Sequence, residues 1–144
     1  MAGKVIGAKL ALFFGDKLAS LQRDDRPGLL WAGHWDLPGG GIEAGETPLQ
    51  CALRETYEEL SIHVPQDTVR WGRDYGASSG DISWFFAAHM PASVADDIRL
   101  GDEGQGWRLI SPAAFLDDPL SVPQFKPRLR DYLAGVASVP FNRS

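Results

Sequence analysis

Hydrophobic residues recur along the chain in short runs that predict β-strands. The first run, Val5–Phe14, is separated by the turn sequence at residues 15–17 from a second run at residues 18–23, and this arrangement predicts a β-hairpin. Three later runs also have the length of strands, and turn-forming residues join two of them. These later strands are predicted at residues 69–75, Ile82–Met90 and Gly106–Ile110.

The clearest helix is predicted at residues 47–60. Thr47 is a good N-cap, Pro48 suits the first helical position, and Gln50 completes a capping box three residues after Thr47. At about 100° per residue, four side chains of this segment fall in one narrow sector that we expect to face the core. They are Leu49, Leu53, Thr56 and Leu60.

The remaining segments complete a layered fold. A second long helix is predicted at residues 126–136, where apolar side chains recur at helical spacing, and a short helix at residues 112–116. A short extended piece is expected at residues 36–45, and loops at residues 24–35 and 96–106. Strands interleaved with two substantial helices indicate an α/β or α+β sandwich with a mixed sheet, built as a single domain over residues 1–144.

Composition narrows the classes of partner. Hydrophobic residues make up 44% of the 144-residue chain and charged residues 23%, which is ordinary for one compact globular domain. The formal net charge is −5, and no tract of Lys and Arg occurs. We therefore expect neither a nucleic-acid polymer nor an anionic membrane as a partner. An acidic protein that handles phosphates needs local neutralisation, for which a divalent metal ion is well suited.

The single cysteine and the apolar start of the chain bear on the compartment. Cys51 has no second cysteine to pair with, so an intrachain disulfide is excluded and a reducing, cytoplasmic compartment is expected. Lys4, Lys9 and Asp16 interrupt the apolar start, and no apolar run approaches the ~18 residues of a membrane span. We expect neither a signal peptide nor a membrane-spanning segment.

Three glutamates of the predicted helix share one face. Glu55, Glu58 and Glu59 lie three and four residues apart, opposite the apolar sector. They repel one another, and they lie near the helix C-terminus, where the helix dipole disfavours negative charge. A hard dication such as Mg²⁺ would stabilise this arrangement, because it binds carboxylate oxygens. The alternative from the helix alone is a solvated acidic face with Arg54 nearby.

A glycine cluster precedes the helix, and together they resemble a known family. Residues 37–41 read Leu-Pro-Gly-Gly-Gly, where the backbone can approach a ligand closely. The Nudix hydrolases carry the signature G-x5-E-x7-R-E-U-x-E-E-x-G-U, with U aliphatic, and every charged position matches here. The matching residues are Gly40, Glu46, Arg54, Glu55, Thr56, Tyr57, Glu58, Glu59, Leu60, Ser61 and Ile62. Thr56 replaces the usual aliphatic residue and Ser61 the usual glycine.

The resemblance implies a fold, a metal site and residue roles. It implies a Nudix-type α/β/α sandwich and a Mg²⁺ site, with Mn²⁺ as a substitute ion. The implied ligands are the Gly39 carbonyl, Glu55, Glu58, Glu59 and, from a segment similar to one in MutT-type members, Glu103. The same three helix glutamates are the implied catalytic residues, and which of them is the general base stays open. Arg54 and Glu46 are expected to pair and to hold the loop of Gly40 against the helix.

The resemblance also suggests substrates without choosing one. Arg23, Gln124 and Phe125 match places where MutT-type enzymes bind substrate, although the spacing around Gln124 differs. The expected substrate is a small nucleotide, with a nucleoside triphosphate (including an oxidised purine) first. A sugar nucleotide or ADP-ribose is the alternative, followed by a module that binds a nucleotide without cleaving it. Many relatives are homodimers, so the oligomeric state stays open.

The replacement at Ser61 leads to two opposed expectations. If the helix ends there in a left-handed conformation, serine carries a backbone penalty that glycine would avoid. If instead the hydroxyl caps a backbone group, serine itself stabilises the turn in place of glycine.

Overall fold

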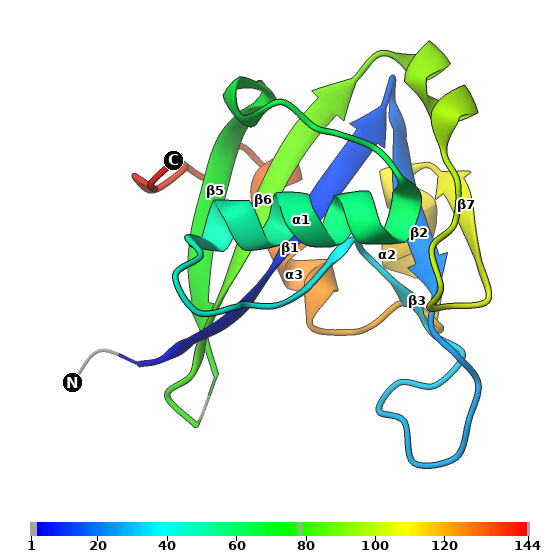
Figure 1. Ribbon diagram of the computed structural model, residues 1–144, viewed down its shortest axis with the longest axis horizontal. Helices are drawn as coiled ribbons and strands as arrows, with labels where there is room; N and C mark the ends of the chain where they lie inside the picture. The colour runs from blue at the N-terminus through cyan, green and yellow to red at the C-terminus, as the bar shows by residue number, and fades with distance from the viewer. Residues whose placement is uncertain (1–2, 78, 144) are drawn as a thin grey trace.

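A computed structural model describes residues 3–77 and 79–143 and shows one mixed sheet between helices (Figure 1). The strand order is β3-β2-β1-β6-β5, with β4 paired to β1 and β7 to β2. The strands are β1 (Val5–Phe14), β2 (Lys17–Gln22), β3 (Trp35–Asp36), β4 (Gly39–Gly41), β5 (Val69–Gly76), β6 (Ile82–Met90) and β7 (Gly106–Ile110). The helices are α1 (Pro48–Leu60), α2 (Pro112–Asp117) and α3 (Phe125–Leu133), with 3₁₀ helices at Gln66–Thr68 and Ala92–Asp97.

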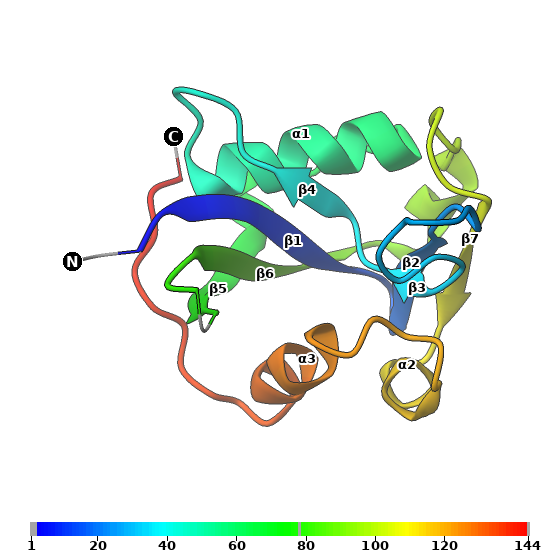
Figure 2. The ribbon, with the colours of Figure 1, turned by 90° about the horizontal axis from the view of Figure 1, so that it is seen from below.

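Helices cover both faces of the sheet. In Figure 2, α1 lies on one side of the strands, whereas α2 and α3 lie on the other. The central strand β1 pairs antiparallel with β2 across the predicted hairpin and parallel with β6. Because both of its faces are covered, β1 is apolar along most of its length, as is usual for a strand in the middle of such a sheet.

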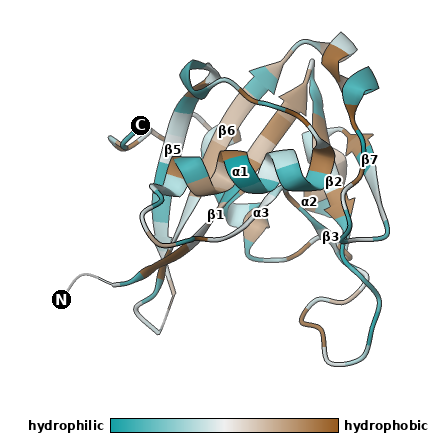
Figure 3. Ribbon diagram, viewed as in Figure 1, coloured by the Kyte–Doolittle hydropathy of each residue, from teal (hydrophilic) through white to brown (hydrophobic). Residues whose placement is uncertain are grey.

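Two hydrophobic cores lie on opposite sides of β1. Successive side chains of a strand point to opposite faces, so Leu10 and Leu12 pack under α1, while Ala11 and Phe13 pack towards α2 and α3. Figure 3 shows the hydrophobic colour concentrated on β1 and β6, while α1 carries both colours. In the described part of the chain, no helix is long and apolar enough to cross a membrane.

Helix α1 begins as the sequence predicts. The Thr47 hydroxyl accepts a hydrogen bond from the Gln50 amide at 3.1 Å, and the Gln50 side chain accepts one from the Thr47 amide at 2.9 Å, which completes the capping box. Leu49, Thr56 and Leu60 are buried as expected, and Leu53 is only partly buried. The buried hydroxyl of Thr56 donates to a helix carbonyl of the preceding turn, so its polarity is satisfied.

Two segments differ from the sequence prediction. The extended piece expected at residues 36–45 is divided into β3 and β4, which pair with different strands. Helix α3 ends at Leu133 rather than at residue 136, because Gly135 adopts a left-handed φ of 78° and the Val136 amide turns back to the Asp131 carbonyl. The helix therefore ends with a glycine that the periodicity alone does not reveal.

Candidate active site

The carboxylates of α1 face a pocket that a distant loop completes. Glu55, Glu58 and Glu59 line a cavity of about 390 Å³ together with residues 101–103. Glu103, expected as a further ligand, belongs to that loop and lines the same cavity. The structure therefore brings Glu103 beside the helix glutamates, from which it is separated by more than forty residues in the sequence.

Hydrogen bonds from the loop amides to carbonyls at the C-terminus of α1 hold this loop in place. The Arg99 amide donates to the Leu60 carbonyl and the Gly101 amide to the Glu59 carbonyl, both at 2.9 Å. These bonds satisfy carbonyls that a helix end leaves without partners. Gly101 must lack a side chain, because an added Cβ would lie 2.1 Å from the Glu58 carbonyl oxygen. The helix that carries three of the glutamates thus also positions the loop of Glu103.

Ser61 ends α1 in a way that combines both expectations. Its φ of 61° and ψ of 29° are left-handed, as expected for a position where the family has glycine. Its hydroxyl also donates to the Arg99 carbonyl at 3.0 Å. Serine therefore carries the backbone penalty and, at the same time, adds a bond to the loop that carries Glu103.

Glu59 is bonded to the glycine strand. The Gly39 amide donates to the Glu59 carboxylate at 2.8 Å. Burial raises the pKa of Glu59 to about 7, although the charge of Lys9 and the Gly39 amide act in the opposite direction. Gly39 has a φ of 137°, and an added Cβ would lie 2.2 Å from the Ala8 carbonyl oxygen, so only glycine fits there. A buried carboxylate of raised pKa is costly to ionise without a nearby cation.

Lys9 lies directly beside the expected metal ligand. Its ammonium donates to the carbonyls of Gly39 and Leu37 at 3.1 and 3.2 Å, and it pairs with Asp36 at 3.2 Å. The sequence pattern alone indicates no role for this residue in the site. The available signal was a single positive charge inside the apolar run of β1, where a lysine must find partners if it points inward.

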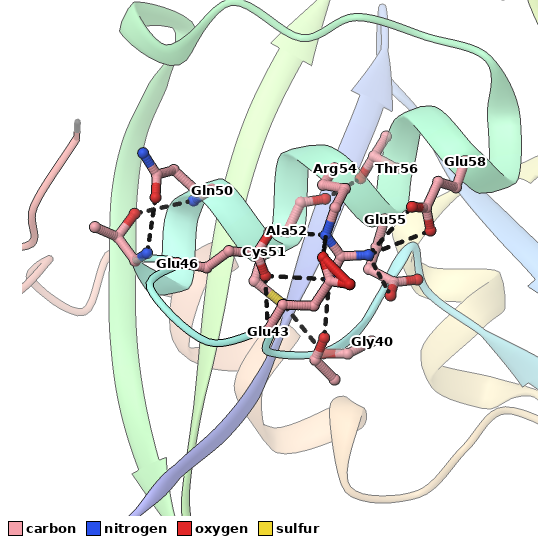
Figure 4. Close-up of polar contacts among 12 residues, drawn as sticks. Gly40, Glu43, Glu46, Gln50, Cys51, Ala52, Arg54, Glu55, Thr56 and Glu58 are labelled. Carbon is pink, nitrogen blue, oxygen red and sulfur yellow. Dashed lines mark hydrogen bonds and ion pairs between the residues drawn. The ribbon is translucent and has the colours of Figure 1, made fainter.

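Arg54 connects the glycine loop to the glutamates (Figure 4). The predicted ion pair is present, with Arg54 Nε 2.7 Å from Glu46, and this hydrogen bond lowers the pKa of Glu46. Nη2 donates to the Gly41 carbonyl at 3.0 Å, which ties the loop to α1. Nη1 contacts Glu55 at 3.0 Å and Glu58 at 3.2 Å. Arg54 therefore also offsets part of the charge of the helix glutamates.

Gly40 leaves space for Glu55. An added Cβ at Gly40 would lie 2.7 Å from the carboxyl carbon of Glu55. A side chain at Gly40, the first glycine of the signature, would therefore displace the Glu55 carboxylate from its present position beside β4.

The donor set suits a hard divalent cation. Carboxylates and a backbone carbonyl are ligands that Mg²⁺ and Mn²⁺ accept. Among the residues described, no three acidic, His or Cys side chains stand in a metal-binding cluster, since Glu55 and Glu58 turn towards Arg54. The Glu58 side chain is 55% exposed and can rotate into the pocket without disturbing the core. The residues therefore fit a metal ion after a side-chain movement.

The residues expected to bind substrate lie in two different pockets. Arg23 borders a cavity that also contains Glu59 and Glu103, and its guanidinium pairs with Asp36 at 2.9 Å. Gln124 and Phe125 line another cavity, which is bordered by β1, β4 and α3. Phe125 is buried in the core under α3, so its ring also has a packing role.

Comparison with known proteins shows the family. A family model described as NUDIX domain matches residues 9–133. The chain belongs to the Nudix family. This Nudix chain is 34% identical over 99 residues to an asymmetrical bis(5'-nucleosyl)-tetraphosphatase of Sus scrofa, covering 65% of this chain and 63% of the relative. It is 31% identical over 129 residues to an RNA pyrophosphohydrolase of Gluconobacter oxydans, covering 75% and 72% of the two chains.

The Nudix fold is also found in solved structures. A MutT protein from Methanosarcina mazei superposes with a TM-score of 0.72 at 19% identity, covering 93% of this chain and 96% of the other. The expected α/β/α sandwich with a mixed sheet is thereby confirmed. The Nudix chain spans less than two thirds of the length of the pig tetraphosphatase, 63% of it.

Proposed function

We propose that this Nudix domain is a Mg²⁺-dependent pyrophosphohydrolase that cleaves the diphosphate linkage of a small nucleotide. A nucleoside triphosphate, cleaved to monophosphate and pyrophosphate, is its first candidate substrate. The observation that carries the proposal is the pocket where Glu55, Glu58 and Glu59 meet Glu103, with Arg23 in the adjoining cavity. A binding module without activity would have no need for all the signature glutamates.

The residues of the pocket divide into ligands and supports. Glu55, Glu58, Glu59, Glu103 and the Gly39 carbonyl would hold the ion. When bound, Mg²⁺ neutralises diphosphate oxygens and lowers the pKa of a water ligand.

One of the helix glutamates that border the pocket also accepts the proton of the attacking water. Mutation of each in turn identifies which one does so. Arg54 and Glu46 keep Gly40 and the helix in register, since misplacing ligands by an ångström weakens catalysis greatly.

The names of the relatives guide the choice of substrates. One relative is named a dinucleoside tetraphosphatase and others RNA pyrophosphohydrolases, so both substrate types belong in the panel. ADP-ribose and a sugar nucleotide represent the alternative, a diphosphate that joins two larger groups. An oxidised purine triphosphate completes the set of nucleotides.

A substrate panel with matched controls tests the proposal. Release of phosphate and nucleotide is measured for each substrate with millimolar Mg²⁺, with Mn²⁺ and with EDTA. We expect metal-dependent turnover of at least one nucleotide, abolished in Glu59→Gln, which keeps the size of the side chain and removes its charge. Asp67→Asn, an exposed acid in the 3₁₀ helix Gln66–Thr68, is the control for loss of one negative charge elsewhere. Turnover that persists in EDTA or in Glu59→Gln would refute the proposal.

A further inference from the structure

A second cavity adjoins the carboxylate pocket and contains arginines. It has a volume of about 250 Å³ and lies between the end of β2, the loop that follows β2, and residues 103–104. Glu59 and Glu103 border both cavities, so the two meet at this pair. A ligand held at Glu59 and Glu103 can therefore extend in either direction. On the second side it reaches Arg23 and Arg26.

Hydrogen bonds fix the walls of this arginine cavity. The Gln105 amide donates to the Gln22 carbonyl, and the Gln105 side chain donates to the Arg23 carbonyl, both at 2.9 Å. The Arg23 amide donates to the His34 carbonyl, which closes the base of the loop after β2. The loop of Glu103 and the loop of Arg26 are therefore held against each other by the backbone at the end of β2.

The two arginines differ in their contacts. Arg23 is engaged, because Nη1 pairs with Asp36 and Nε donates to the Leu30 carbonyl at 3.0 Å. The exposed Arg26 guanidinium makes no hydrogen bond or ion pair within residues 3–77 and 79–143. It is therefore a cation at the rim of the cavity that is available to a ligand.

The charges of the arginine cavity indicate the chemistry of that ligand. Its lining has two arginines and four acids, the latter being Asp24, Asp36, Glu59 and Glu103. An anion alone is repelled by this surplus of negative charge, but an anion that arrives with a divalent cation is not. Arg26 then meets the oxygens that the cation leaves free, since a guanidinium binds phosphate through two parallel hydrogen bonds.

We propose that Arg26 binds the phosphates beyond the cleaved linkage and makes the domain selective for chains of three or more phosphates. This inference rests on the proposed function and names its substrate class. A nucleoside triphosphate or dinucleoside tetraphosphate continues from Glu59 and Glu103 to Arg26 with further phosphates. ADP-ribose brings a ribose to the same place, and a ribose has no charge for the guanidinium to bind.

The test compares two arginine variants on two substrates. Arg26→Gln removes the charge at the cavity, and Arg70→Gln removes one from an exposed position on β5, at the opposite edge of the sheet. With Mg²⁺ and ATP, we expect kcat/KM to fall about tenfold in Arg26→Gln, in line with loss of a charge-assisted contact with phosphate at an exposed site. With ADP-ribose, kcat/KM of Arg26→Gln should stay within about twofold of that of the native protein. Arg70→Gln should have the kcat/KM of the native protein on both substrates. An equal fall on both substrates, or no fall with ATP, overturns the inference.

A binding measurement separates this inference from the proposed function. Calorimetry with inorganic tripolyphosphate and Mg²⁺ should give a Kd about tenfold weaker for Arg26→Gln than for Arg70→Gln. Arg26-dependent binding of tripolyphosphate in a protein that hydrolyses nothing supports the phosphate site and refutes the proposed function. If the protein hydrolyses nucleotides but binds tripolyphosphate equally well in Arg26→Gln and Arg70→Gln, the phosphate site is refuted and the proposed function is not.

Discussion

Replacement of Ser61 by Gly and by Ala separates the two effects that meet at the end of α1. Ser61→Gly removes a left-handed penalty of about 1–2 kcal/mol. It also removes the hydrogen bond to the Arg99 carbonyl, worth about 0.5–1.5 kcal/mol. In addition, glycine raises the conformational entropy of the unfolded chain, which lowers native stability by about 0.4–1 kcal/mol. The gain and the losses nearly cancel, so we expect the free energy of unfolding to change by less than about 0.5 kcal/mol.

Ser61→Ala removes only the favourable effect. Alanine keeps the left-handed penalty and loses the hydroxyl, so we expect a loss of about 1 kcal/mol, or about 4 °C in Tm for a domain of this size. Urea unfolding at constant slope measures both variants. Ser61→Gly more stable than the native protein by over about 1 kcal/mol would show that the hydroxyl contributes nothing. A neutral Ser61→Ala would lead to the same conclusion.

Three further predictions concern charge and packing around the pocket. In EDTA, Glu59→Gln should stabilise the protein by up to about 3 kcal/mol at pH 8 and by nothing near pH 4. The reason is that the pKa of Glu59 is about 7 in the folded protein and 4.5 in the unfolded chain, so ionisation of Glu59 lowers native stability as the pH rises from 4.5 to 7. In urea titrations, millimolar Mg²⁺ should reverse the order of the two proteins at pH 8, and an unchanged order would contradict a metal site at Glu59. Arg54→Met should lower the free energy of unfolding by about 2 kcal/mol in EDTA. Part of this loss should be recovered in Mg²⁺, because the ion then replaces the guanidinium beside Glu58. Equal losses of stability with and without Mg²⁺ would refute that exchange. Gly101→Ala should displace the loop of Glu103, lower the unfolding midpoint and shrink the Mg²⁺-induced rise in Tm, whereas an unchanged rise would show that Glu103 does not bind the ion.

The sequence predicts most of the framework because its signals are local. The capping box of Thr47, the hairpin at residues 15–17 and the ion pair of Arg54 each depend on residues that are near in sequence or fixed by one helix. The left-handed end of α1 is equally local, and the structure confirms it at Ser61.

The parts that sequence reasoning missed depend on contacts across the fold. Lys9 finds its three carbonyl and carboxylate partners only because β4 lies against β1. A backbone partner for the hydroxyl of Ser61 was one of the two expectations, but no spacing rule predicts that this partner is the carbonyl of residue 99. The arginine cavity combines β2 with a loop eighty residues later, so Arg26 gave no signal in the sequence beyond being one more charge.

The loop between β2 and β3 is joined to the rest of the molecule by hydrogen bonds at its base and by Trp31, which packs against the core under α2 and α3. Bonds within the segment close it, such as those from Gly33 to Asp24 and from Leu29 to Arg26, and Gln105 holds the strand end from which it leaves. None of these bonds involves the helix glutamates. The length and sequence of this loop can therefore change during evolution while α1 and its carboxylates keep their geometry. A single hydrolytic centre could in this way acquire new substrates by exchanging one surface loop.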